Sequence, residues 1–250
     1  MSEPLVPFTG EAPPTATPSA LTTPRVRLGA WSLALGSLQF FIAMAVEQAL
    51  RPGYLAVGPG SNTISDLGVN IDGWGYAWIF DGSIIVLGAL AIAGIIAIYP
   101  ILPRSSLSYP ASYVLAMGCV GAIGVGLFTE QSTWMGGHAH DYFSVWTFAW
   151  ANFGLFLMGL AMWGDSRWGR YALLTTFLGI LSTIALGFYI QNILTNGAFF
   201  GLGEGGLERV VAFPVLLWAI LVGAVILRRA SLEGRSLSRP SAVPSAGSAS

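Results

Sequence analysis

Two histidines one residue apart, followed directly by an aspartate, are the residues of this sequence best suited to metal chemistry. They are His138, His140 and Asp141. Imidazole and carboxylate groups bind zinc when a further ligand comes from elsewhere in the chain, and Asp66 and Glu130 are the candidates. A zinc ion held by His138, His140 and Asp66 would make the protein a metal-dependent membrane hydrolase. The alternative is structural: the histidines hydrogen-bond to neighbouring loops, and Asp141 caps a helix that begins nearby.

A serine and an aspartate in the run from 61 to 68 form a second candidate. Ser65 could act as a nucleophile if His138 or His140 supplied the base. Otherwise Ser65 and Asp66 brace a turn ending at Gly68, a residue type that accepts positive φ. Both interpretations stay open at this point, because a sequence does not show the geometry of a serine–histidine pair.

Glu208 and Arg209 open the last apolar run of the chain. An ionised group in or beside a bilayer needs a partner or water, so we expect Arg209 to pair with a carboxylate of another loop. Asp66 is the first choice, ahead of Glu130 and Asp141. If Asp66 also lies near a histidine, the three polar stretches form a single site. The alternative is a set of solvated loops at the level of the lipid headgroups.

Polar residues inside the apolar runs have two expected roles. Tyr189 and Asn192 approach one end of their run, where they would line the proposed site from below. Gln39 and Asn152 lie farther inside, and we expect them to make hydrogen bonds between helices.

The elements that position these residues are membrane helices. Apolar residues make up 54% of the 250 and charged residues 9%, against about 25% charged in ordinary soluble domains. A helix needs about 20 apolar residues to cross a bilayer. Six runs approach that length, at about 28–49, 76–100, 110–129, 142–163, 171–194 and 207–228. The sequence therefore predicts an all-α, six-helix transmembrane bundle with a long first loop, from about 50 to 75.

The arginines predict the orientation of this bundle, because cytoplasmic loops carry an excess of basic residues. Only Arg51 and Arg209 fall on the side of the long first loop. The other nine fall on the opposite side: 25, 27, 104, 167, 170, 228, 229, 235 and 239. We therefore expect a plasma-membrane protein with both termini in the cytoplasm and with its candidate site facing outward.

Proline, serine and alanine dominate both ends of the chain. Segments of this composition lack the apolar content to fold, so residues 1–27 and 230–250 are expected to be disordered tails around a membrane domain at 28–229. The net charge of -1 argues against a nucleic-acid partner. The single cysteine, Cys119, cannot form an intrachain disulfide.

Four short motifs resemble a known family. They are Ile64 to Gly68 (Ile-Ser-Asp-Leu-Gly), Gly126-Leu127-Phe128, a histidine near the fourth run, and Gly205 to Arg209. On these motifs residues 28–229 resemble the prokaryotic integral membrane family catalogued as domain of unknown function 998. The resemblance implies six membrane helices but no activity.

Three functions fit the sequence. The leading one is a non-enzymatic membrane protein that binds a small-molecule ligand, a lipid headgroup or a partner at its outer loops. The second is the zinc-dependent hydrolase, and the third is a small-solute transporter. The sequence does not decide between enzyme and binding protein, and it gives no oligomeric state.

Overall fold

The computed structural model describes residues 20–70, 75–197 and 199–237. Within these ranges, six helices are long and apolar enough to cross a membrane, which confirms the predicted fold class. They are α1 (Pro24–Leu50), α2 (Ala77–Ile98), α3 (Ser108–Leu127), α4 (Ala139–Met162), α5 (Gly169–Thr195) and α6 (Gly203–Leu237). Large apolar side chains such as Leu173 and Phe177 stay exposed along α5, as expected of a surface that lipid covers.

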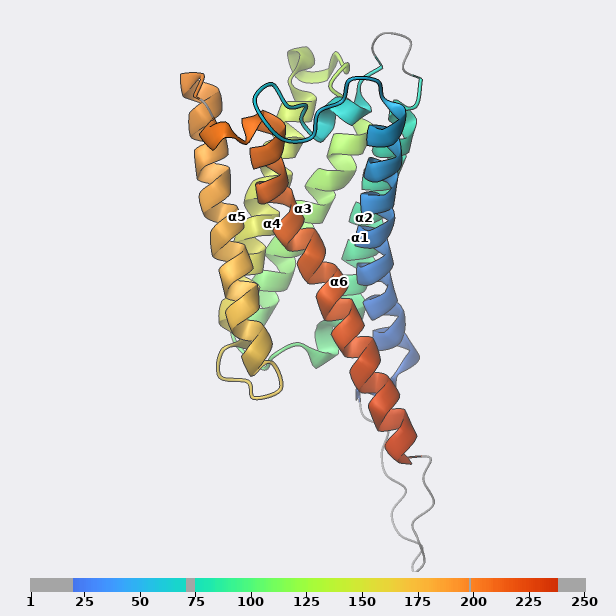
Figure 1. Ribbon diagram of the computed structural model, residues 1–250. Coiled ribbons are helices and arrows are strands. Elements are labelled where there is room, and N and C mark those ends of the chain that lie inside the picture. The colour runs from blue at the N-terminus through green and yellow to red at the C-terminus, as the bar shows by residue number, and fades with distance from the viewer. Residues whose placement is uncertain (1–19, 71–74, 198, 238–250) are drawn as a thin grey trace, which may run out of the picture.

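The six helices form a closed ring. Each helix packs on its neighbour in the chain, and α6 closes the ring by packing on both α1 and α5. Figure 1 shows α6 crossing the bundle obliquely between these two helices. Because the helices surround a common centre, five of them can contribute side chains to one interior site.

Close approach of the helices depends on glycine. A Cβ atom at Gly118 of α3 would lie 2.6 Å from the backbone nitrogen of Ala151 in α4. Gly126, eight residues later, faces α2 instead, where a Cβ would lie 2.5 Å from the Asp81 carbonyl oxygen. Residues 118, 122 and 126 therefore follow the seam between two neighbours rather than a single partner helix.

The bundle has two unlike ends. One end holds the long connections 51–76, 128–138 and 196–202, and we call it the loop-rich end; it is at the top of Figure 1. Arg51 and Arg209 belong to it. The opposite end holds the start of α1, the end of α6 and two short connections, 99–107 and 163–168. The remaining described arginines lie there: 25, 27, 104, 167, 170, 228, 229 and 235.

Both terminal helices extend beyond the predicted membrane domain. Thr23 and Pro24 start α1 before residue 28, because the Thr23 hydroxyl accepts from the Val26 N–H and proline suits the first helical position. Helix α6 runs on to Leu237, so residues 230–237 are helical rather than part of a tail. The next proline comes only at position 240. The expected tail regions 1–19 and 238–250 lie outside the described residues.

Candidate functional site

The first loop folds inward over the loop-rich end of the bundle. Ile64 and Leu67 carry it down: their side chains are 4% and 0% exposed. The Tyr54 hydroxyl donates to the Thr63 carbonyl at 2.6 Å and closes the loop on itself. Ser65–Gly68 then forms a single 3-10 turn (η2), so this motif is a structured part of the cover over the helices.

Asp66 serves this turn directly. The Thr63 N–H donates to Asp66 Oδ2 at 2.8 Å, and the Asp66 N–H donates to Thr63 Oγ1 at 3.1 Å. This reciprocal pair has the form of a capping box, in which two side chains satisfy the free N–H groups at the start of a helical turn. Arg51 also donates to the Asp66 carbonyl oxygen. Asp66 thus has the bracing role that the sequence offered as an alternative.

The start of α6 lies directly against the loop. The Gly58 N–H donates to the Leu202 carbonyl at 2.6 Å, and the Gly206 N–H donates to Ser61 Oγ at 3.4 Å. A Cβ at Gly205 would lie 1.8 Å from the Asn62 carbonyl oxygen. The backbones therefore touch at this point, and a glycine is required there.

Glu208 joins α6 to the inner side of the loop. It is 2% exposed, and its carboxylate accepts from the Ile64 N–H and, at 3.4 Å, from the Ser65 hydroxyl. Buried carboxylates need such donors. Ser65 thus bonds to a carboxylate, and neither histidine has a hydrogen bond to it within the described parts of the chain. The nucleophilic serine–histidine pair is not formed.

Arg209 does not form the expected pair with Asp66. Its Nη1 donates to the carbonyl oxygens of Asn62 at 3.2 Å and Gly205 at 2.7 Å, and its Nη2 donates to the Tyr54 hydroxyl at 2.6 Å. Among the described residues, no carboxylate lies within ion-pair distance of this guanidinium. The guanidinium is instead bonded to the Asn62 carbonyl of the loop and the Gly205 carbonyl of α6, while the Asp66 carboxylate accepts from the Thr63 N–H.

Partial burial raises the pKa of the Tyr54 hydroxyl to about 12. Its hydroxyl therefore stays protonated at neutral pH and can accept from Arg209 while it donates to Thr63. The guanidinium carbon lies 5.7 Å from the centre of the Tyr54 ring, which adds a cation–π contact. Tyr54 thus holds Arg209 together with the Asn62 and Gly205 carbonyls, and no motif in the sequence marks it for this role.

The two histidines have separate roles. His138 is exposed, and its Nδ1 lies 3.3 Å from Asp141 Oδ2. His140 is buried: its Nδ1 lies 2.9 Å from the Phe128 carbonyl, and its Nε2 lies 3.8 Å from Glu130 Oε1. The sequence suggested Asp141 as a cap of α4. Asp141 instead lies within the first turn of that helix, beside His138.

The zinc site expected from His138, His140 and Asp66 is therefore not assembled. In the described ranges, no three histidine, cysteine, aspartate or glutamate side chains lie close enough to hold a metal ion. Side chains two positions apart near a helix start point to different sides of the helix. A His-x-His spacing there therefore places one ring in solvent and the other in the interior.

Glu130 lies in the connection between α3 and α4, at the loop-rich end of the bundle. Burial raises its pKa to about 7, and the negative charges of Asp66, Asp141 and Glu204 add to the effect. These acids outnumber the two arginines of this end, whose donors are already directed to the first loop. The loop-rich end therefore disfavours anionic ligands.

Tyr189 and Asn192 stabilise the turn between α5 and α6. The Tyr189 hydroxyl donates to Glu204 at 3.3 Å. Asn192 donates to the Phe188 carbonyl at 2.8 Å and accepts from the Phe199 N–H at 3.1 Å. Neither residue lines the central cavity described next.

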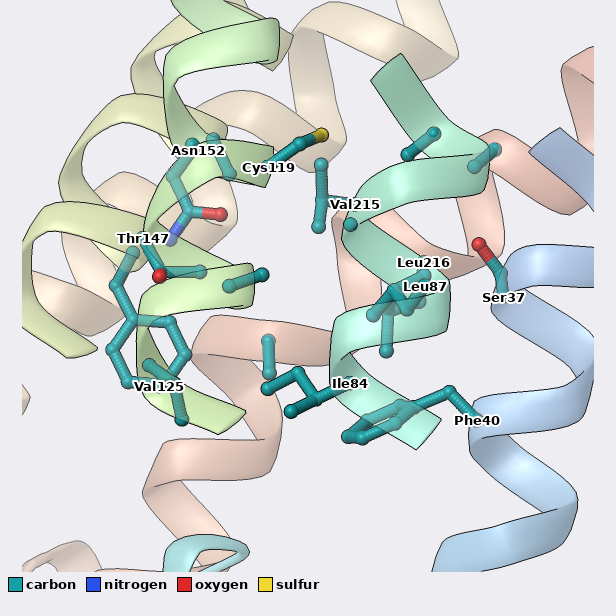
Figure 2. A pocket seen from close by; sticks show the side chains of 18 of the residues that line it. Ser37, Phe40, Ile84, Leu87, Cys119, Val125, Thr147, Asn152, Val215 and Leu216 are labelled. Carbon is teal, nitrogen blue, oxygen red and sulfur yellow. The ribbon is translucent and has the colours of Figure 1, made fainter. Parts of the chain in front are cut away.

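A cavity of about 110 Å³ lies in the centre of the ring, below the first loop. Helices α1, α2, α3, α4 and α6 line it, with Ile64 and Ser65 of the first loop; none of the described α5 residues does. Its wall is almost entirely apolar. The polar exceptions are Ser37, Ser65, Ser144, Thr147, Asn152 and Glu208. Figure 2 shows Asn152 and Thr147 on one wall and Ser37 on the other.

The interhelical hydrogen bonds expected of the buried amides are formed by one residue and not by the other. Gln39 of α1 donates to the Ser83 carbonyl of α2 at 2.8 Å, as predicted. Asn152 is 1% exposed, and its Nδ2 has no hydrogen-bond partner in the described structure. A periodic pattern could not reveal this, because Asn152 points into a space and not onto a neighbouring helix.

Comparison with known proteins agrees with the motifs. The family model described as "Protein of unknown function (DUF998)" matches residues 34–225, most of the chain. The chain belongs to the DUF998 family. No curated protein and no solved structure matches it. The DUF998 match begins within α1 and ends within α6, so it contains the first loop, Glu208, Arg209 and the residues that line the cavity except Leu33.

In this DUF998 chain the polar residues around the first loop and the cavity thus fall into two groups. Tyr54, Asp66 and Arg209 hold the first loop in place. Glu208, Ser65 and Asn152 border an interior space and can contact a molecule inside it. The second group offers hydrogen bonds in a dry, mostly apolar setting, which is typical of a binding site.

Proposed function

We propose that this multi-pass membrane protein binds a small, mostly apolar ligand in the central cavity. The loop-rich end faces away from the cytoplasm, and the first loop covers the cavity on that side. The observation that carries the proposal is that the loop itself completes the cavity wall. Ile64 and Ser65 line it together with Glu208 of α6, to which both are hydrogen-bonded.

The contacts of the loop support a cover with a defined closed position. Tyr54, Glu208 and Arg209 hold residues 62–65 through side-chain hydrogen bonds, and the Gly205 backbone touches Asn62. A loop that served only as a connection would not need a buried carboxylate and a buried guanidinium. Charged groups leave water at a cost that must be offset by such contacts.

The size and lining of the cavity limit the ligand. An apolar cavity of about 150 Å³ binds benzene, so a space of about 110 Å³ suits a small ring or a few methylene groups. A ligand that is larger, such as a lipid, would place only part of its chain there. The excess of acidic groups around the loop favours a neutral or cationic polar end over an anionic one.

Fluorobenzene is a suitable probe, because its ¹⁹F signal reports binding to the purified protein in detergent. We expect a saturable bound signal with the wild-type chain and its loss in Ala122→Leu, because Ala122 is 4% exposed and lines the cavity. Ala89→Leu is the matched control, since Ala89 lies on an exposed face of α2 outside the cavity. Equal signals from the two variants would mean that the probe only partitions into lipid-facing surfaces or micelles.

A further inference from the structure

The centre of the cavity contains one hydrogen-bond donor that the protein does not use. Asn152 lies near the middle of α4, roughly 20 Å from the helix start at a rise of about 1.5 Å per residue. Its Nδ2 is buried and without a partner in the described structure. In Figure 2 the carboxamide projects from α4 into the cavity, with its oxygen toward Val215 and its nitrogen toward Thr147. A buried amide donor left unsatisfied costs about 1–3 kcal/mol.

The neighbouring polar group does not remove this cost. The Thr147 hydroxyl donates to the Phe143 carbonyl at 2.7 Å, and within the described structure it accepts no hydrogen bond from Asn152 Nδ2. The rest of the nearby wall consists of residues such as Leu115, Cys119 and Ala151. A group that satisfies Asn152 must therefore come from inside the cavity.

The chemistry of that group follows from what surrounds it. An N–H donor requires an acceptor. An anionic acceptor is disfavoured, because the cavity wall contains no basic side chain and Glu208 places a carboxylate at its loop end. Arg51 and Arg209 are directed to the first loop instead. A neutral oxygen in an otherwise apolar molecule remains, and a carbonyl is the strongest common acceptor of this kind.

We infer that the cavity takes a ligand whose apolar body carries a neutral carbonyl oxygen, and that this oxygen accepts a hydrogen bond from Asn152 Nδ2. The inference rests on the proposed function and adds the chemical class of the ligand. The carbonyl can belong to a compact free ketone or to an acyl chain. The two sources share the contact with Asn152 and differ in what extends from the cavity.

The test compares probes that differ only in the acceptor. Cyclohexanone and methylenecyclohexane have similar shapes, and only the ketone carries an oxygen. Their binding to the purified full-length protein in deuterated detergent is measured by saturation-transfer NMR. The wild-type chain is compared with Asn152→Leu, which keeps the side-chain size but has no donor, and with Asn152→Ala in case the leucine variant folds poorly.

The partition of a given probe into micelles is the same whichever protein variant is present. The measured quantity is therefore the ratio of ketone binding to hydrocarbon binding, compared between the wild type and each variant. We expect a ketone preference of roughly five- to tenfold in the wild type and its loss in both Asn152 variants. Ser182→Ala is the control: it removes a buried hydroxyl of α5 that bonds to the Leu178 carbonyl outside the cavity, and it should leave the preference unchanged.

A second pair of probes distinguishes the sources. 1-Octanoylglycerol and 1-O-octylglycerol differ in an ester carbonyl, and an Asn152-dependent preference for the ester indicates an acyl lipid. A preference confined to the ketone indicates a compact free ligand. An equal preference for the carbonyl probes in the wild type and in both Asn152 variants would overturn the inference. It would also be overturned if the wild type preferred neither carbonyl probe, which is the result expected if water alone fills the cavity. Fluorobenzene binding that persists in that case leaves the proposed function standing.

Discussion

The Arg209 guanidinium donates to the Tyr54 hydroxyl at 2.6 Å, and so joins the start of the last membrane helix to the first loop, 155 residues away in sequence. The same hydroxyl donates to the Thr63 carbonyl at 2.6 Å. One tyrosine therefore connects a buried cation with the segment that covers the cavity. If the cover is functional, its closed position depends on this connection.

The first prediction tests the connection by a double-mutant cycle. Tyr54→Phe leaves both Arg209 Nη2 and the Thr63 carbonyl without their partner, and we expect a loss of about 1–3 kcal/mol. Arg209→Lys also destabilises, because an ammonium cannot contact Tyr54, Asn62 and Gly205 with the geometry of a guanidinium. Thermal unfolding in detergent should show a smaller loss for the double variant than the sum of the single losses.

Asp66→Asn provides the comparison for this cycle. Asparagine keeps an oxygen that can accept from the Thr63 N–H, and Asp66 has no direct contact with Arg209. We therefore expect the losses from Asp66→Asn and Arg209→Lys to add. Strong coupling between Asp66→Asn and Arg209→Lys, with no coupling between Tyr54→Phe and Arg209→Lys, would support the Asp66–Arg209 ion pair that the sequence first suggested.

The second prediction concerns the contact between the loop and α6. In Gly205→Ala the new methyl would lie 1.8 Å from the Asn62 carbonyl and 2.9 Å from Arg209 Nη1, so the loop must move. We expect a loss of about 1–3 kcal/mol, seen as a lower melting temperature and faster proteolysis within residues 51–70. Gly187→Ala is the matched control, because a Cβ there meets nothing within 4 Å. Equal behaviour of the two variants would show that the loop is not held against α6.

The third prediction is a pH dependence that originates at Glu130. Its pKa rises from 4.5 to about 7 on folding, so the folded state keeps a proton that the unfolded state releases. The stability contributed by neutral Glu130 is complete below pH of about 4.5 and is lost as the pH rises through about 7. Glu130→Gln stays neutral throughout. The melting temperature of Glu130→Gln, relative to that of the wild type, should therefore rise as the pH increases from about 5 to about 8.

The control for this prediction addresses His140, whose Nε2 lies 3.8 Å from Glu130 Oε1. A histidine can titrate in the same pH range. The wild type and Glu130→Gln are therefore compared again in a His140→Asn background. The difference between them should persist there. A pH profile that Glu130→Gln leaves unchanged in both backgrounds would assign the dependence to another group.

The helices were predictable from the sequence because they depend on local properties. Apolar length marks a membrane span, but the exact start of α1 was missed, because the Thr23 cap and Pro24 lie in a segment whose composition suggested a tail. The inward fold of the first loop was also predictable. Its apolar residues, Ile64 and Leu67, must leave water, and the neighbouring glycines permit the tight turns they require.

The partners inside the site were not predictable, and the reasons are physical. Arg209 binds backbone carbonyls, which every residue carries and which no residue type can indicate. The role of Asn152 depends on the direction in which one face of α4 points within the ring. A sequence with apolar residues on all sides of a helix does not encode that direction in a periodic pattern.

The fourth prediction is the orientation, which rests on the distribution of arginine between the two ends. Thr133→Cys at the loop-rich end and Ser106→Cys at the opposite end are both exposed. In a Cys119→Ala background, a membrane-impermeant thiol reagent applied to intact cells should modify the cysteine at 133. The cysteine at 106 should react only after the membrane is permeabilised. The reverse pattern would place the loop-rich end in the cytoplasm.

The last prediction tests whether the central cavity can hold additional apolar atoms. Ala122→Leu adds apolar atoms inside a cavity of about 110 Å³, and filling a void in this way commonly stabilises by about 0.5–2 kcal/mol. Ala30→Leu makes the same change where no space exists: Ala30 is 0% exposed, and its carbonyl lies 2.5 Å from the position of a Cβ at Gly223. That variant should lose about 1–3 kcal/mol by overpacking. Melting temperatures measured without added ligand should therefore move in opposite directions. A loss in Ala122→Leu as large as that in Ala30→Leu would mean that the helices close around Ala122, leaving no room for a ligand to occupy.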